Sequence, residues 1–193
     1  MLYDGVIYRK LTPIVALESV MQKVSVTRKQ WKNTPFLAGE PLPYRAQFSE
    51  AEYEKLCMGV LPAQMEDKWF VFFEEPYVYF HRSWTGQPVY RVKVERSESS
   101  IAVTEALWEL SFARATPEQV PYQAELLDFL ISNLLLGMSK PFPQPQSVPG
   151  PAGILQHHIA GTGYAERPAE GHAFTATPSL PPSPARPWWK FWR

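Results

Sequence analysis

The sequence predicts an α+β domain over residues 1–137, in which an antiparallel four-stranded meander packs with about three helices. Four stretches rich in aromatic and β-branched residues are separated by short turns, which is typical of antiparallel neighbours. Segments with apolar residues at helical spacing precede and follow these stretches. After Gly137 the composition changes: eleven of the twenty prolines lie there, which predicts a disordered proline-rich tail over residues 138–193.

The predicted helices have recognisable ends. Thr12-Pro13 has the form of an N-cap followed by proline in the first turn, and this first helix is expected to run to about Lys23. Ser49 and Glu52 form a capping-box pattern for a second helix that stops at Gly59. The last helix is expected between Pro121 and Gly137, where leucines and an isoleucine form a broad apolar face.

The four predicted strands lie between the second and the last helix. They are Trp69–Phe73, Tyr77–Trp84, Val89–Glu95 and about Ala102–Phe112. The first of these is apolar on both faces, so we expect it to be a central strand. The turns between the first three are Glu74-Glu75-Pro76 and Thr85-Gly86-Gln87-Pro88.

The stretch Phe80–Gly86 is the most distinctive polar cluster of the predicted domain. Because side chains alternate along a strand, His81 and Ser83 are expected on one face, and Arg82 and Trp84 on the other. One interpretation is a ligand site, in which Arg82 binds an anion, Trp84 stacks on a ring and His81 acts as acid, base or donor. The ligand-binding candidates are then Tyr79, His81, Arg82, Ser83, Trp84 and Thr85.

The second interpretation of the same cluster is structural. Arg82 would pair with Glu74, Glu75 or a helix carboxylate, and the hydroxyl groups of Ser83 and Thr85 would bind the backbone of the turn. Gly86 would supply a positive φ angle. The sequence leaves both interpretations open.

Other chemistry has weaker support in the sequence. The formal net charge is zero, so specific nucleic-acid binding is not expected. Cys57 is the only cysteine, and the start of the chain lacks a basic region followed by an apolar stretch, which together predict a cytoplasmic protein. No metal-ligand spacing or nucleotide-binding motif is present, so no metal and no cofactor are predicted.

The chain ends in an aromatic and basic segment. Aromatic rings beside basic groups suit either a pocket on a partner protein, docking on the chain's own domain, or a membrane interface. The candidate anchor residues are Trp188, Trp189, Phe191, Trp192 and Arg193.

Part of the chain, roughly Phe48 to Leu136, resembles a family of small uncharacterised bacterial proteins. The shared pattern is Gly59-x-x-Pro62-x-x-Met65-Glu66-Asp67-Lys68-Trp69-Phe70, then Tyr79-Phe80-His81-Arg82-Ser83-Trp84-Thr85-Gly86, then Tyr90-Arg91-Val92. The resemblance suggests an association with enzymes that process ADP-ribose, and what it implies is the choice of nucleotide-like ligands for screening.

Three functions follow as hypotheses. The first is a non-enzymatic binding protein that uses the His81–Gly86 surface and the aromatic tail. The second is an enzyme on a nucleotide-like substrate, with His81 as acid or base, Arg82 as anion clamp and Glu74 or Glu75 as the complementary carboxylate. This reading requires these groups to converge on one cleft. The third is an adaptor tethered to a membrane by its tail.

Overall fold

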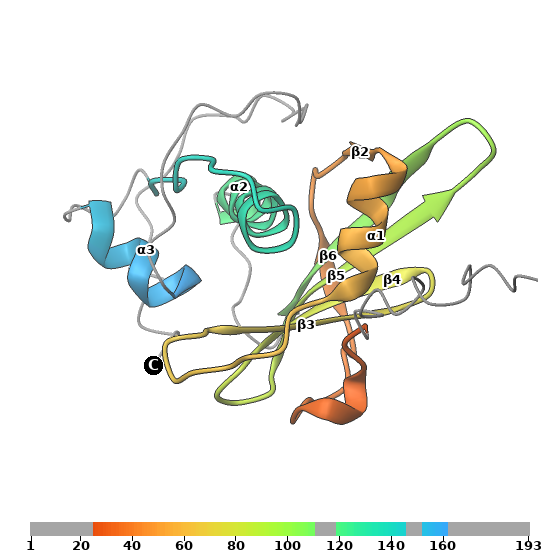
Figure 1. Ribbon diagram of the computed structural model, residues 1–193. Helices are drawn as coiled ribbons and strands as arrows, with labels where there is room; N and C mark the ends of the chain where they lie inside the picture. Colours follow the sequence, from red (N-terminus) through yellow and green to blue (C-terminus); the bar gives the residue numbers. More distant parts are fainter. Residues whose placement is uncertain (1–24, 111–118, 146–151, 162–193) are drawn as a thin grey trace, which may run out of the picture.

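The computed structural model describes residues 25–110, 119–145 and 152–161, so the predicted first helix lies outside the described residues. The described chain has an α+β fold, as predicted (Figure 1). Its longer strands are β3 (Trp69–Glu74), β4 (Tyr77–Arg82), β5 (Pro88–Arg96) and β6 (Ile101–Glu109). Each pairs antiparallel with the next, which confirms the four-stranded meander.

Two short strands extend the sheet beyond the meander. They are β1 (Gly39–Pro41) and β2 (Gln47–Phe48), and both pair antiparallel with β6. The resulting strand order is β1-β6-β5-β4-β3. The sequence did not show β1 and β2, because their residues lie in a proline-rich loop with no alternating pattern.

The expected central position of Trp69–Phe73 is wrong, because β3 is the last strand in the order. Both of its faces are nevertheless covered, and Trp69 and Phe70 are both buried. An isolated bridge partly covers its outer edge: Val60 N–H donates to Val71 O at 2.8 Å, and Val71 N–H donates back at 2.9 Å. The continuous apolar sequence of β3 therefore indicated correctly that both faces of the strand are buried, but it did not indicate where the strand lies in the sheet.

Helix α1 (Glu50–Met58) begins and ends where the sequence predicts. The Glu52 carboxylate accepts from Ser49 N–H at 2.8 Å, and Ser49 Oγ accepts from Glu52 N–H at 3.3 Å, which completes the capping box. Gly59 follows with φ of 68°. Local residue chemistry thus determines both ends of this helix.

The last predicted helix is present in two parts. Helix α2 (Gln119–Phe129) continues directly into the π-helix η3 (Leu130–Leu135), and Gly137 follows with φ of 73°. Pro121 lies in the first turn of α2 rather than at its first residue. The Asn133 side chain bonds both the N–H and the C=O of Lys140 at 2.8 Å, which fixes the chain after the helix.

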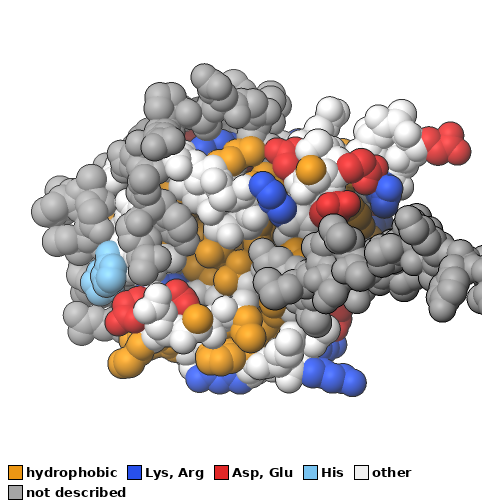
Figure 2. Space-filling model, in the orientation of Figure 1, with side chains coloured by type: hydrophobic (Ala, Val, Ile, Leu, Met, Phe, Trp, Pro, Cys, Tyr) orange, Lys and Arg blue, Asp and Glu red, His pale blue; other side chains and the backbone are white. Residues whose placement is uncertain are grey.

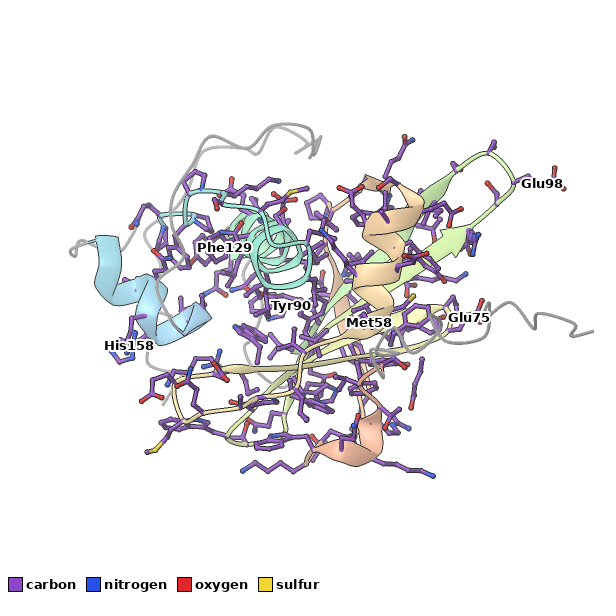
Figure 3. All side chains as sticks on the ribbon, viewed as in Figure 1. Met58, Glu75, Tyr90, Glu98, Phe129 and His158 are labelled. Atoms are coloured by element: carbon purple, nitrogen blue, oxygen red, sulfur yellow. The ribbon has the colours of Figure 1, made fainter. Side chains whose placement is uncertain are left out.

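The two faces of the sheet differ. We call the one that carries Trp69, Phe80 and Tyr90 the helix face, because α1, α2 and α3 (Ala152–Ala160) lie on its side (Figure 1). Tyr90 stacks on Trp69 at 6.1 Å between ring centroids and points towards α2, where its hydroxyl binds Gln123 (Figure 3). The short 3-10 helix η1 (Arg28–Gln30) lies on the opposite side (Figure 1).

Two stretches after Gly137 lie against the domain rather than apart from it. Phe142 is buried beside Phe129, with ring centroids 5.2 Å apart in an edge-to-face arrangement. Ile159 and Ala160 of α3 are buried in the same core as the sheet. The prediction of disorder over residues 138–193 does not describe these two stretches. Each carries a few apolar side chains, which the high overall proline content of the region does not reveal.

Candidate functional site

His81 lies on the face opposite the helices, which we call the aromatic face, and only 1% of its surface is exposed. Its ring stacks on Phe72 at 5.3 Å, and its Nδ1 lies 3.0 Å from Gly86 O. A carbonyl oxygen only accepts, so Nδ1 carries the proton and Nε2 is the acceptor. Within the described residues, Nε2 is buried without a partner.

The environment of His81 favours its neutral form. Burial lowers its pKa, the bond to Gly86 O partly opposes this effect, and the nearby charge of Arg28 adds to the lowering. The imidazole ring is thus an uncharged, buried packing element of the aromatic face. It does not contact solvent, as an acid or base that serves an external substrate must.

Arg82 points to the helix face, so His81 and Arg82 lie on opposite sides of the sheet, as alternation predicts. Its Nη1 donates to Ile159 O at 2.9 Å and its Nη2 to His158 O at 3.5 Å. Trp69 Nε1 donates to the same Ile159 oxygen at 2.9 Å, and the guanidinium lies 4.9 Å from the Trp69 ring centroid.

These contacts fasten the C-terminal end of α3 to the sheet. A cation is favoured there, because the last carbonyl groups of a helix carry partial negative charge. Burial nevertheless lowers the pKa of Arg82 to about 10. The structure corrects the expected pairing of Arg82 with Glu74 or Glu75: its guanidinium donates to carbonyl groups of α3.

The glutamates lie at the other end of the hairpin. Glu74 pairs with Arg28 at 3.2 Å, and it stands opposite Tyr77 in the register, whereas Arg82 stands opposite Trp69. These two positions are five residue steps apart along the strand, or roughly 17 Å. Glu75 likewise lies far from His158, which marks the helix that Arg82 contacts (Figure 3). The predicted groups therefore do not converge on one cleft.

Tyr79 shares the aromatic face with His81. Its ring stacks on Phe72 at 5.0 Å, and it is half-buried. Burial raises its pKa, while the charges of Arg91 and Arg28 lower it and Glu74 raises it. The hydroxyl is therefore surrounded by two cations and a carboxylate, each of which already has an ion-pair partner.

Thr85 and Gly86 act in the β4–β5 turn as the structural interpretation predicted, whereas the Ser83 hydroxyl binds the loop before β3 instead of the turn. Ser83 Oγ donates to Asp67 O, and Thr85 Oγ1 accepts from Gln87 N–H at 3.3 Å. Gly86 has φ of 75°, and a Cβ there would lie 2.9 Å from Lys32 O. The turn thus joins the loop before β3 to the segment that follows η1.

Trp84 is the exception in this cluster, because 56% of its surface is exposed. Its indole Nε1 donates to Met65 O at 2.9 Å, and Lys68 Nζ lies 4.2 Å from the ring centroid. Met65 is 71% exposed. Trp31 is also exposed, and its indole donates to Ser83 O at 2.7 Å. We call Met65, Lys68 and Trp84 the Trp84 surface.

Hydrophobic side chains and nearby lysines or arginines gather along the lower margin of the molecule (Figure 2). The sequence did not identify Met65 as a partner of Trp84, or Trp31 as a partner of Ser83. Met65 lies in the stretch Gly59–Phe70 that resembles the small bacterial proteins, and Trp31 is a tryptophan in a lysine- and asparagine-containing loop. Neither signal shows which distant segment the residue contacts.

The described part of the chain bears on only some of the predictions about anchor residues, metal binding and membrane contact. Trp188, Trp189, Phe191, Trp192 and Arg193 lie outside the described residues. In the part of the chain that the structure describes, no three His, Cys, Asp or Glu side chains are grouped to hold a metal ion. No helix among those residues is long and apolar enough to cross a membrane.

Comparisons with protein-family models, with curated proteins and with solved structures found no match for this chain. The resemblance to small bacterial proteins therefore stays a prediction.

Proposed function

We propose that this protein is a non-enzymatic binding module that holds an aromatic or apolar peptide segment of a protein on its Trp84 surface. The observation that carries this proposal is the position of Trp84, which is more than half exposed while its indole N–H and one ring face are already engaged. Tryptophan is a frequent hot-spot residue in protein interfaces.

The contacts of Trp84 support binding because they reduce its entropic cost. A free tryptophan side chain loses rotamer freedom when a partner immobilises it, at a cost of about 0.5–1.5 kcal/mol. The bond to Met65 O and the Lys68 ammonium group already restrict the ring. Met65 beside it adds a thioether that adapts to differently shaped apolar partners.

Several of the other predicted ligand residues are engaged within the fold. His81, Ser83 and Gly86 are buried, and Arg82 binds helix carbonyls. An enzyme acting on a nucleotide-like substrate needs His81, Arg82 and a glutamate in one cleft, and no observation favours that alternative. We therefore place the binding surface at Trp84 and its neighbours rather than along the whole His81–Gly86 segment.

A selection from random displayed 12-residue peptides tests the proposal. The full chain is used as bait, in parallel with a full chain carrying W188A, W189A and W192A, because the tail is itself a candidate contact. We expect aromatic-rich peptides that lose at least tenfold in affinity for W84S and bind L37S unchanged, since Leu37 is exposed but outside this surface. Peptides that bind W84S as tightly as the parent would overturn the proposal.

A further inference from the structure

We propose that the peptide segment held on the Trp84 surface is the chain's own aromatic segment, Trp188–Arg193, docked within the same molecule. This inference rests on the proposed function, because it names the occupant of the same surface. It is argued from where the described chain ends, from the length that follows, and from the chemistry of the two parts.

The described chain ends beside the Trp84 surface. Gly161 is buried, and a Cβ at this residue would lie 2.7 Å from Glu66 O and 3.5 Å from Lys68 Cγ. Its backbone is therefore packed against the loop that carries Met65 and Lys68. The bonds from Arg82 and Trp69 to Ile159 O hold this end of α3 in place, so the exit point is fixed.

The length of the following chain suits an intramolecular contact. The 26 residues from Thr162 to Pro187 separate the exit point from Trp188. A Gly/Ser-type coil of 26 residues has an end-to-end distance of about 28 Å, and proline-rich stretches extend further, so this length is ample for a domain whose radius of gyration is about 14 Å. Such linkers give effective concentrations in the millimolar range. A contact with a dissociation constant of about 100 μM would then be about 90% closed.

The chemistry of the segment complements the surface. Trp188–Arg193 offers three tryptophans, one phenylalanine, Lys190 and Arg193. Aromatic rings pack favourably against tryptophan and against the methionine thioether, which are the exposed groups of Trp84 and Met65. The exposed carboxylate of Glu66, next to Met65, supplies a partner for either basic group.

Docking of this kind makes the tail a competitor for outside partners. A partner that binds the Trp84 surface must first displace the segment, so its apparent affinity falls by the closed-to-open ratio. At about 90% closed the loss is about tenfold. Removing the tail tryptophans therefore raises the affinity of the selected peptides by the same factor.

Methyl NMR of the full chain with ¹³C-methyl methionine tests the docking. The chain has five methionines, and M65L assigns the Met65 signal. We expect W188A/W189A/W192A to move the Met65 signal by more than its line width, because tail rings no longer lie beside it, and to leave Met58 and Met138 unmoved. The matched control is Y164A/F174A, which removes two tail aromatics outside the segment and should leave Met65 in place.

Two results would overturn the inference. One is a Met65 signal that does not respond to the tail tryptophans; tail-dependent sedimentation with vesicles of 3:1 phosphatidylcholine and phosphatidylglycerol would then place the segment on lipid. The other is a response that grows with protein concentration, because that places the segment on a second copy. In each case the peptide selection still decides the proposed function separately.

Discussion

Gly86→Ala and Gly137→Ala form a matched pair that tests how the β4–β5 turn is held. The two glycines have almost the same φ, 75° and 73°. A Cβ at Gly137 meets nothing within 4 Å, whereas a Cβ at Gly86 would lie 2.9 Å from Lys32 O and 3.0 Å from Lys32 C. The substitutions therefore share a backbone cost and differ in one steric contact.

The magnitudes follow from these contacts. A left-handed conformation costs a residue with a Cβ about 1–2 kcal/mol, which applies to both variants. At Gly86 the Lys32 backbone must also move, and this displaces the bond from Thr34 N–H to Gly86 O, at 2.8 Å, and the bond from Trp31 Nε1 to Ser83 O. Each such bond contributes about 1 kcal/mol. We expect a loss of about 1–2 kcal/mol for G137A and about 3–4 kcal/mol for G86A.

Urea denaturation of the full chain, followed by far-UV circular dichroism, measures both free energies of unfolding. The gain from a less flexible unfolded chain is the same for two Gly→Ala changes, so it cancels in the difference. Equal losses in the two variants would refute the reasoning, because the contact between the turn and Lys32 would then contribute nothing.

Three further predictions concern single side chains. Arg82→Ala should lower the free energy of unfolding by about 2–3 kcal/mol and speed amide exchange in α3, because charged donors to two carbonyls are lost. The control Arg91→Ala removes a partly exposed ion pair with a glutamate and should lower it by less than about 1 kcal/mol. Unchanged amide exchange of α3 in Arg82→Ala would contradict the role of Arg82 in holding this helix. His81 has a lowered pKa in the folded state, so the unfolded chain takes up the proton first and stability should fall as pH drops below about 6.5. His81→Phe should flatten this slope between pH 7.5 and 5.5 in urea titrations, and an equally steep slope in the variant would show that other groups cause it. Trp84→Ser should change the melting temperature by less than Gly86→Ala does, because its ring is mostly exposed, and a comparable drop would mean that Trp84 is kept for stability.

Local sequence signals predicted much of this fold correctly. The Ser49–Glu52 capping box and the glycines after the helices act over three or four residues, so their partners are visible in the sequence. Alternation along β4 likewise placed His81 and Arg82 on opposite faces. The meander followed from turns short enough to require antiparallel neighbours.

The partners of the candidate site residues could not be predicted in the same way. Arg82 contacts Ile159, 77 residues away, and Trp31 contacts Ser83 across 52 residues. Nothing local favours one distant carbonyl over another, because every residue carries the same acceptor. The choice depends on how the whole core packs.

By itself, the sequence determined the four strands of the meander, helix α1, the last helix and which side chains of β4 share a face, because these properties depend on neighbouring residues. The tertiary structure alone decided that β3 lies at an edge, that α3 packs back on the sheet, and that Trp84 remains exposed while His81 is buried. These properties depend on which distant surfaces bury one another, and burial of apolar area is not specific to any position in the chain.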